Sequence, residues 1–359
     1  MPGSPAPPEP EAADVGGDGS PEGINQASLE AWFVANVEGA APPLTFERLA
    51  GGRSNLTYAV TDRAGRRLAL RRPPLGPRLG SAHDMGREYR VISALRDTPV
   101  PVAPALAMCT DEEVIGAPFY LMEFVDGHVL RSADSAGSFS EAQRAEIGDR
   151  VADTLVAVHD VDPDAVGLGE LGRKEDYVAR TLKRWIGQWE KSKTRELDLV
   201  GDVHARLEAR IPDQGPAAIV HGDYRLDNMI VAESGEIAAV VDWELCTLGD
   251  PLADIGLLLV YWSDPGDELV PLVETPTIAP GFPSREHIRD RYAERSGRDL
   301  SQIDFYVALG YWKLAVVLEG VYARYAAGQY GEGQSGYEAL GQMVDRLVVA
   351  ADEAERRLG

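Results

Sequence analysis

Short runs of alternating apolar and polar positions dominate the first third of the chain. Three of these runs, at residues 45–50, 57–61 and 67–71, are separated by the turn-forming segments GGRSN and DRAGR. Alternation of this kind, interrupted by glycine-containing turns, predicts three antiparallel strands. Two further apolar runs at 105–109 and 119–123 predict a fourth and a fifth strand of the same small sheet.

Helical spacing occurs before and inside this predicted sheet. The segment SLEAWFVANV begins at Ser28 with Glu30 close behind it, which is the pattern of a capped amphipathic helix, and the pair Pro42-Pro43 ends it. The segment HDMGREYRVISALRD has the helical period as well. Its predicted apolar side carries Met85, Tyr89, Ile92 and Leu95.

The chain after Gly127 is mostly helical by the same criterion. Helices are predicted at 140–159, 174–192, 284–296, 304–327 and 336–358. Short apolar runs at 217–220, 229–231 and 237–242 interrupt this pattern, with the turn ESGE between the last two. They predict a β-hairpin inside a helical region, and the predicted fold class is therefore α+β.

The first 23 residues contain six Pro, five Gly, five acidic residues and no Lys or Arg. Such a segment cannot bury enough apolar surface to offset its ordering entropy, so we predict a disordered tail at 1–23. It does not have the composition of a signal peptide, which favours a cytoplasmic location. We assign 24–125 to a first lobe and 126–359 to a second. Two distant cysteines, Cys109 and Cys246, indicate neither a disulfide framework nor a zinc site.

The composition is acidic, because 35 Lys and Arg against 58 Asp and Glu give a net charge of −23. This balance argues against nucleic acid or an anionic membrane as a partner, since both need clustered basic residues. The longest uninterrupted apolar stretch, 255–262, is far shorter than the ~20 residues of a membrane-spanning helix, so we expect no transmembrane segment. The oligomeric state cannot be predicted from these features.

The most informative polar residues flank the predicted hairpin, in HGDYRLDNMIV at 221–231 and in VVDWELCTLGDPLADIG at 240–256. Asn228 follows Asp223 by five positions, and Asp242 lies at the other end of the hairpin. An amide oxygen and a carboxylate at a hairpin mouth form the oxygen-only kind of site that Mg²⁺ prefers. With Asp223 facing an incoming hydroxyl, this is the arrangement of a phosphoryl-transfer site. A structural interpretation stays open, in which these short motifs are turn formers and helix caps.

The two segments resemble the aminoglycoside phosphotransferase and choline kinase-like family, which has the fold of protein kinases. HGDYRLDNMIV is similar to the catalytic-loop motif of that family, and VVDWE is similar to its metal-binding motif. The likeness covers about residues 44 to 327. Within the family, LRRPP, SAHDMGREYRVISAL and VIGAPFYLMEFVDG are closest to the kinase-like domains associated with acyl-CoA dehydrogenases.

The resemblance implies a two-lobed fold in which the small sheet and its helix form the nucleotide-binding lobe. The loop over the phosphates is then LAGGRSNLTYAV at 49–60. Glycines there allow close approach of the backbone, and polar side chains add donors. The residues expected to contact the nucleotide in this loop are Gly51, Gly52, Arg53, Ser54 and Asn55.

Kinases use a strand Lys that pairs with a helix Glu to hold the α- and β-phosphates. This sequence has Arg71 at that position, with Glu88 as its expected partner 17 residues later. Strand alternation puts Arg71 and Arg72 on opposite faces, and we expect Arg72 to be a solvated neighbour. An Arg can still bind two phosphate oxygens, with a different reach. The resemblance also implies that backbone groups of Glu123 and Val125 contact the adenine.

Other polar residues near the motifs are expected to have structural roles. His221 is expected to brace the catalytic loop, whereas His159 and His204 are expected to be ordinary surface or helix-end residues. Asp250 and Asp254 either cap the following helix or anchor the catalytic loop, and we favour anchoring. Glu244 follows the metal-binding Asp and has either a structural role or a contact with a second metal or with substrate.

These inferences lead to a small-molecule kinase that uses ATP and Mg²⁺. Asp223 is expected to accept the proton of the acceptor hydroxyl, and Asn228 and Asp242 to hold the metal. The segment between Asp242 and Asp250 is too short to be a peptide kinase's activation loop, so a small acceptor is favoured. An aminoglycoside, an amino alcohol and a hydroxyacyl-CoA are all open, with the likeness favouring a metabolite. The alternative is a nucleotide-binding pseudokinase, and a hydrolase would lack a positioned nucleophile.

Overall fold

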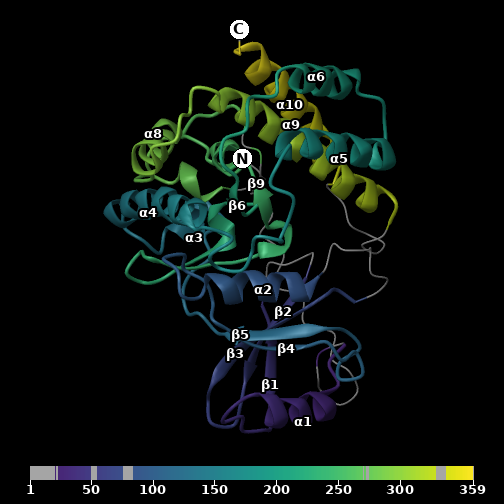
Figure 1. Cartoon of the computed structure of the whole chain (residues 1–359), viewed down its shortest axis with the longest axis vertical. Coiled ribbons are helices and arrows are strands. Elements are labelled where there is room, and N and C mark those ends of the chain that lie inside the picture. Colours follow the sequence, from purple (N-terminus) through teal and green to yellow (C-terminus); the bar gives the residue numbers. More distant parts are fainter. Residues whose placement is uncertain are drawn as a thin grey trace, which may run out of the picture. The chain divides into compact units, whose positions relative to one another are not determined.

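The structure is a computed structural model that describes residues 21, 23–49, 55–75, 84–269, 271, 275–328 and 337–358. The chain divides into two compact units (Figure 1). Unit 1 consists of Met1–Arg96 and Val102–Val125, and unit 2 consists of Asp97–Pro101 and Asp126–Gly359. The predicted tail lies almost wholly outside the described residues.

Unit 1 contains an antiparallel sheet in which five strands have the order β1-β2-β3-β5-β4. This confirms the predicted small sheet. Its register pairs Ala59 of β2 with Ala69 of β3, and Leu70 of β3 with Leu121 of β5. The elements are α1 (Gln26–Asn36), β1 (Thr45–Arg48), β2 (Leu56–Thr61), β3 (Arg67–Arg72), α2 (Met85–Leu95), β4 (Ala105–Cys109) and β5 (Phe119–Glu123).

Helix α1 begins earlier than predicted. Its N-cap is Asn25, whose side chain accepts a hydrogen bond from the backbone N–H of Ser28 at 3.2 Å. Ser28 therefore lies inside the first turn of α1 and does not cap it. Ile24, just before the cap, is buried in the core, so the folded part of unit 1 begins before Ser28.

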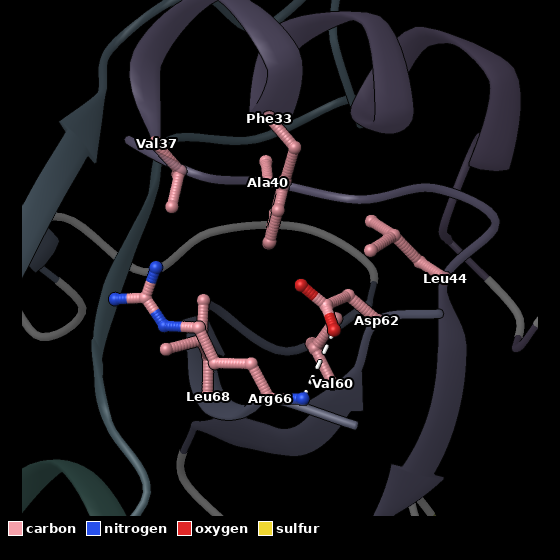
Figure 2. Close-up of a pocket in the computed structure, with 8 residues that line it drawn as sticks. All are labelled: Phe33, Val37, Ala40, Leu44, Val60, Asp62, Arg66 and Leu68. Carbon is pink, nitrogen blue, oxygen red and sulfur yellow. Dashed lines mark hydrogen bonds between the residues drawn. The ribbon is translucent and has the colours of Figure 1, made fainter. Parts of the chain in front are cut away.

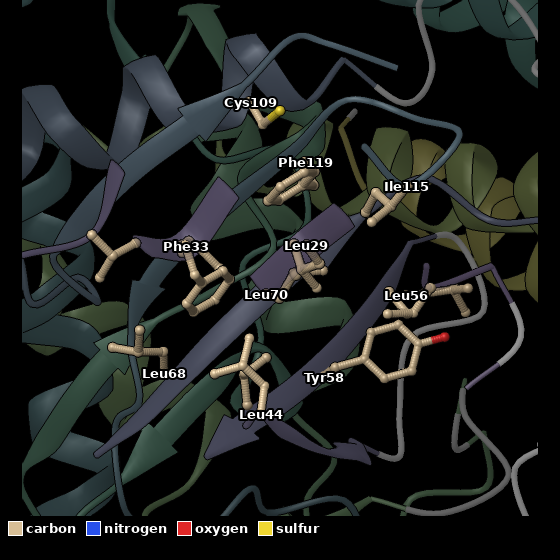
Figure 3. Packing of buried hydrophobic residues seen from close by; sticks show 14 residues of the cluster. Leu29, Phe33, Leu44, Leu56, Tyr58, Leu68, Leu70, Cys109, Ile115 and Phe119 are labelled. Atoms are coloured by element: carbon tan, nitrogen blue, oxygen red, sulfur yellow. The ribbon is translucent and has the colours of Figure 1, made fainter. Parts of the chain in front are cut away.

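The two helices of unit 1 cover opposite faces of its sheet. On one face Leu29 and Phe33 of α1 pack against Leu68, Leu70 and strand β5 (Figure 3). Because side chains alternate along a strand, Ala69 and Arg71 of β3 point to the other face, which α2 covers (Figure 1). The apolar contacts of that face come from the buried side chains of α2, which are Met85, Val91, Ile92 and Leu95.

A pocket lies at the edge of α1, where apolar side chains of α1, β2 and β3 converge (Figure 2). Its two charged lining residues, Asp62 and Arg66, lie in the β2–β3 turn. A carboxylate oxygen of Asp62 accepts a hydrogen bond from the backbone N–H of Arg66 there, at 2.9 Å. The other lining residues are apolar, so the pocket is part of the core packing and offers no chemistry.

Unit 2 is mostly helical, as predicted. Its helices are α3 (Ala133–Ala136), α4 (Glu141–Asp160), α5 (Tyr177–Ser192), α6 (Asp198–Ala209), α7 (Leu252–Tyr261), α8 (Arg285–Ser296), α9 (Ile303–Ala326) and α10 (Glu338–Arg356). Its strands are β6 (Ala218–Val220), β7 (Met229–Val231), β8 (Ile237–Val240) and β9 (Thr247–Gly249). The predicted hairpin is confirmed as β7 and β8, whereas β6 pairs with β9. Helices α3 and α6 and strand β9 were not predicted.

One described helix, α9, is long and apolar enough to cross a membrane. In this structure most of its apolar window is buried inside unit 2, where α9 packs against α7 and α10. Core helices pass the same test of length and composition. A single helix of this kind is therefore weak evidence for a membrane span.

Candidate functional site

The hairpin brings together the two residues that were predicted to hold a metal. Met229 of β7 pairs with Val240 of β8, and the backbone N–H of Val241 donates to Asn228 O at 2.9 Å. Asn228 thus lies opposite Val241, and Asp242 is the next residue along the chain. Asp242 has a φ of +65°, in the left-handed region, so the backbone turns at this residue.

The side chain of Asn228 is fixed by Asp223. Its Nδ2 donates to the Asp223 carbonyl oxygen at 2.8 Å and to the Asp223 carboxylate oxygen Oδ2 at 3.0 Å. With the NH₂ group committed to these two acceptors, the amide oxygen faces the opposite way. No described residue donates a hydrogen bond to that oxygen.

Two further side chains hold the carboxylate of Asp223. The Tyr261 hydroxyl at the end of α7 donates to Oδ1 at 3.1 Å, and Nε of Arg225 lies 3.4 Å from Oδ2. Burial, and then the Asp223 carboxylate, raise the pKa of Tyr261 well above its ordinary value. The phenol therefore stays protonated and donates to Asp223, which leaves the carboxylate oriented by three side chains.

Arg225 is a site residue that the sequence analysis missed. Besides Asp223, it contacts Asp227 through a 2.8 Å ion pair, and its guanidinium lies 5.0 Å from the centre of the Tyr261 ring. Burial lowers the pKa of Arg225, but the field of Asp223 and the neighbouring acids raises it overall. Arg225 is thus a permanent positive charge beside Asp223. The position of Arg225, two residues after Asp223, could have identified it as a site residue. No feature of the sequence indicates that Tyr261 reaches Asp223.

The backbone of the predicted catalytic loop is held by Asp254, in the first turn of α7. Its two carboxylate oxygens accept the backbone N–H groups of His221 at 2.6 Å and Gly222 at 2.9 Å. The predicted anchoring is confirmed for Asp254. It is wrong for Asp250, which caps α7 through the N–H of Leu252 at 3.0 Å and accepts the Tyr306 hydroxyl at 2.6 Å.

His159 corrects another prediction. It is buried, and its ring nitrogens lie 2.7 Å from the Tyr292 hydroxyl and 3.4 Å from Asp254 Oδ2. Burial lowers the pKa of His159, and Asp254 acts in the opposite direction. His159 is therefore part of the support of the catalytic loop and not a surface residue. Likewise His204 lies partly buried, with its ring 5.5 Å from that of Trp312.

The loop itself needs His221 and Gly222 at their positions. His221 is buried and its Nε2 lies 3.0 Å from Val241 O, which confirms its bracing role and links the loop to the hairpin. Gly222 has a φ of +87°, and a Cβ there would lie 3.0 Å from the carbonyl oxygen of Leu245. Both its conformation and its surroundings therefore require glycine.

Lys313 of α9 also reaches this loop, and the sequence analysis missed it. Its Nζ donates to Gly222 O at 2.8 Å. Burial lowers the pKa of Lys313, while Asp223 and Asp254 oppose that effect. A lone cation in the apolar run YWKLAVV was the signal that could have identified it.

The remaining predicted site residues lie in unit 1, where Arg71 and Glu88 form the predicted ion pair. Nε of Arg71 donates to Glu88 Oε2 at 2.7 Å, and a second nitrogen lies 3.4 Å from Oε1. Tyr120 also donates to Oε2, at 2.8 Å. Glu88 is almost completely buried, so its charge is compensated by hydrogen bonds rather than by water.

The loop preceding Asn55 was predicted to contact phosphates, and Gly51, Gly52, Arg53 and Ser54 lie outside the described residues. Asn55 is described and is buried, with its Nδ2 donating to Glu88 Oε1 at 3.1 Å. The amide of Asn55 therefore supports the Arg71–Glu88 pair, and a contact of Asn55 with phosphate stays a prediction.

Arg72 differs from the expectation that it is solvated. It is buried on the α1 face of the sheet, where it donates to the carbonyl oxygens of Ile115 at 3.2 Å and of Gly23. Its guanidinium thus ties β3 to two loops of unit 1. The alternation of faces is confirmed, but Arg72 has a structural role.

Glu123 and Val125 lie at the end of unit 1, after β5. The side chain of Glu123 is exposed, and its backbone N–H donates to Pro104 O at 2.9 Å. The backbone groups of Val125 have no hydrogen-bond partner among the described residues. Any contact of Glu123 with a base must therefore use its carbonyl group, whereas Val125 offers both of its backbone groups.

Comparison with known proteins gives a consistent family. A model described as "Phosphotransferase enzyme family" matches residues 45–306. Two mouse proteins, acyl-CoA dehydrogenase family members 10 and 11, are 34% identical over 291 residues and 33% identical over 312 residues. The matches cover 80% and 84% of this chain but 27% and 40% of the relatives, so the chain spans less than half the length of these two proteins.

Solved structures show the same likeness. A protein from Ralstonia eutropha JMP134, described as an aminoglycoside phosphotransferase, aligns with a TM-score of 0.79 and 33% identity, over 93% of this chain and 99% of that one. A choline kinase from Cryptosporidium parvum Iowa II aligns with a TM-score of 0.64 at 14% identity, over 93% of this chain and 96% of that one. The predicted resemblance and the kinase-like fold are thereby confirmed.

Proposed function

Because the chain belongs to the phosphotransferase enzyme family, we propose that it transfers the γ-phosphoryl group of ATP to a hydroxyl of a small molecule. One observation carries this proposal: Asp223, Asn228 and Asp242 converge at one hairpin mouth. A catalytic-loop Asp together with a metal-holding Asn and Asp are the parts that phosphoryl transfer requires. The family and the fold support the reaction class, and ATP, Mg²⁺ and the acceptor are parts of the proposal.

The residues at the hairpin mouth fit Mg²⁺. Asn228 directs its amide oxygen away from Asp223, and Asp242 supplies a carboxylate, which are ligands that Mg²⁺ prefers. We assign Asn228 and Asp242 to hold the ion. When bound, Mg²⁺ neutralises charge that develops on the phosphate oxygens.

Asp223 is assigned to the acceptor hydroxyl. As the acceptor oxygen forms a bond to the γ-phosphorus, the bond from that phosphorus to the bridging oxygen breaks and ADP leaves with the electron pair. The hydroxyl proton passes to the carboxylate of Asp223. Tyr261 and Asn228 hold this carboxylate by one oxygen each, so it is oriented before the acceptor arrives.

Residues of unit 1 are assigned to the nucleotide. Arg71, held by Glu88, is a permanent cation suited to phosphate oxygens. The backbone of Glu123 and Val125 is assigned to the adenine edge. Val125 can offer both its backbone N–H and its carbonyl group there. An aminoglycoside phosphotransferase that was solved with streptomycin and ATP, and another that was solved with ADP, share this fold, which supports ATP as the donor.

A metabolite is the favoured acceptor. Curated relatives are named as acyl-CoA dehydrogenase family members, which supports a metabolic role over drug inactivation. A hydroxyacyl-CoA or an amino alcohol is therefore placed ahead of an aminoglycoside.

The test is a screen of hydroxyl-bearing metabolites and aminoglycosides with ATP and Mg²⁺, scored by the mass of one added phosphoryl group. We expect at least one acceptor to gain it, and Asp223→Asn to slow that gain by roughly 10²- to 10⁴-fold. Failure over a broad panel, with ATP binding intact, would favour the second candidate.

That second candidate is a nucleotide-binding pseudokinase that senses ATP or scaffolds a partner. The observation in its favour is Arg71 in place of the usual Lys, with two of its nitrogens committed to Glu88. The oriented Asp223 and Asn228 argue against it, because a chain without catalysis has no need to fix this carboxylate.

A further inference from the structure

Lys313 has more hydrogen-bonding capacity than the described chain uses. Its ammonium lies partly buried beside the catalytic loop and donates to Gly222 O, one residue before Asp223. An ammonium has three donors, and the other two have no acceptor among the described residues. Partly buried donors without an acceptor are costly, so this position is suited to a ligand oxygen.

A second cation lies close to Lys313. The ring of Trp185, on α5, is 5.8 Å from Nζ of Lys313 and 5.4 Å from the guanidinium carbon of Arg184. Arg184 makes no ion pair with any residue in the described ranges. Two cations beside one indole repel each other, and a bound anion would reduce this repulsion.

The acids near Lys313 are already committed to other partners. The oxygens of Asp254 accept backbone N–H groups of His221 and Gly222, and those of Asp223 accept Asn228 and Tyr261. Arg184 adds to the effect of burial in lowering the pKa of Lys313, whereas Asp223 and Asp254 oppose it. An incoming oxyanion would compensate both cations at once.

We propose that Lys313, Arg184 and Trp185 form a subsite for an oxyanion of the acceptor, a carboxylate or a phosphate ester, close to the hydroxyl that Asp223 receives. This rests on the proposed phosphotransferase function. The subsite favours negatively charged acceptors and disfavours amino alcohols and aminoglycosides, because their ammonium groups would face Lys313. Lys313 is thus a specificity-determining residue of the acceptor site.

The test uses three-carbon alcohols that differ in charge: 3-hydroxypropionate, propane-1,3-diol and 3-aminopropan-1-ol, with glycerol 3-phosphate as the phosphate arm. The full chain with ATP and Mg²⁺ is assayed for phosphorylated product by mass, and with ADP for probe binding by ligand-observed NMR. We expect the anionic probes to exceed the cationic probe at least about tenfold in kcat/KM or affinity. The two anionic arms show whether carboxylate or phosphate is preferred.

Substitutions connect this preference to the subsite. Lys313→Met and the exposed Arg184→Gln should each remove most of the preference, and Lys313→Arg should retain it. Arg184→Gln keeps the test valid should Lys313→Met fail to fold. The matched control is Lys191→Met, which removes one exposed charge from α5, the helix that carries Arg184. It should leave the charge preference intact.

The outcomes separate the two proposals. Charge-selective binding that depends on Lys313, without any phosphorylated product, supports the subsite, and the broad acceptor panel then decides about the phosphotransferase. Phosphorylation without charge preference, or with a preference unchanged in both variants, overturns the subsite and leaves the phosphotransferase. If no anionic probe binds or reacts, the subsite is overturned.

Discussion

The side-chain amide of Asn228 donates to both the carbonyl and the carboxylate of Asp223, at 2.8 Å and 3.0 Å. These bonds couple the proposed metal ligand to the proposed proton acceptor. Removing the Asp223 side chain would also release Asn228. A substitution that tests the role of Asp223 must therefore keep an oxygen at the same place.

Asp223→Asn meets this condition, because its amide retains an acceptor oxygen for Asn228 while it no longer accepts a proton. We expect Mg²⁺-dependent ATP binding to persist and turnover to fall by roughly 10²- to 10⁴-fold, the range for a proton-accepting side chain. Calorimetric titration with ATP, with and without Mg²⁺, measures the first quantity, and product mass measures the second. Loss of the Mg²⁺ dependence in this variant would move Asp223 into the metal site.

Asp242→Ala is expected to act differently, because it removes a charged oxygen ligand from the hairpin mouth. The Mg²⁺-dependent part of ATP binding should fall together with turnover. The same titration measures the Mg²⁺-dependent part of ATP binding. The control is Glu236→Ala in the β7–β8 turn, which also removes one carboxylate, but an exposed one. Should Mg²⁺ dependence survive Asp242→Ala unchanged, the hairpin mouth is not a metal site.

The two neighbouring arginines of β3 should separate by phenotype. Arg71→Ala should raise the KM for ATP or lower kcat at least about tenfold, because a charged phosphate contact is lost. Arg72→Ala should instead lower the free energy of unfolding by about 1–3 kcal/mol, since it leaves the carbonyl groups of Gly23 and Ile115 without their donor. Thermal melts and ATP kinetics on both variants check this. A stable Arg72→Ala with impaired ATP use would reverse the two roles.

Local sequence patterns predicted much of unit 1. The β2–β3 turn and the alternation of Leu70 and Arg71 depend on neighbouring residues, so both could be read directly. The pairing of Arg71 with Glu88, 17 residues later, was implied by the family resemblance and is confirmed by the structure. The burial of Arg72 could not be predicted, because its acceptors at Gly23 and Ile115 lie 49 and 43 residues away.

In unit 2 the motif predicted the hairpin trio but not the residues that orient it. Tyr261 and Lys313 come from helices 38 and 91 residues away from their loop partners, and only tertiary packing brings them there. His159 was misjudged for the same reason, since its partner Asp254 lies 95 residues later. Helix periodicity places such residues on a helix but does not identify the neighbouring element.

Gly222→Ala tests whether the loop conformation matters for function. The φ of +87° costs an alanine about 1–2 kcal/mol, and its Cβ would also press on the carbonyl group of Leu245. Gly65→Ala is the matched control, because Gly65 has a φ of +84° and no atom near its Cβ position. Both variants should melt at a lower temperature, and only Gly222→Ala should lose turnover, at least about tenfold. Equal activity of the two variants would contradict the tight loop.

The buried His159 makes stability depend on pH in a predictable direction. Because burial lowers the pKa of His159 from its ordinary 6.5, the unfolded chain binds a proton there that the folded chain does not. Folding should therefore lose stability as the pH falls below about 6.5, down to the folded pKa. Burial raises the pKa of Asp254, but the interactions with His159, His221 and the backbone N–H of Gly222 lower it overall, so its contribution is lost only well below this range.

Thermal melts at about pH 7.5 and about pH 5.5 measure this effect. His159→Gln removes the titrating group while keeping a polar side chain beside Tyr292 and Asp254, the partners of His159. The wild type should lose more in Tm over this interval than His159→Gln, by about 2 °C or more. His287→Gln, a change at an exposed histidine of α8, should behave like the wild type. An equal loss in the wild type and His159→Gln would show that His159 is not responsible for the pH dependence.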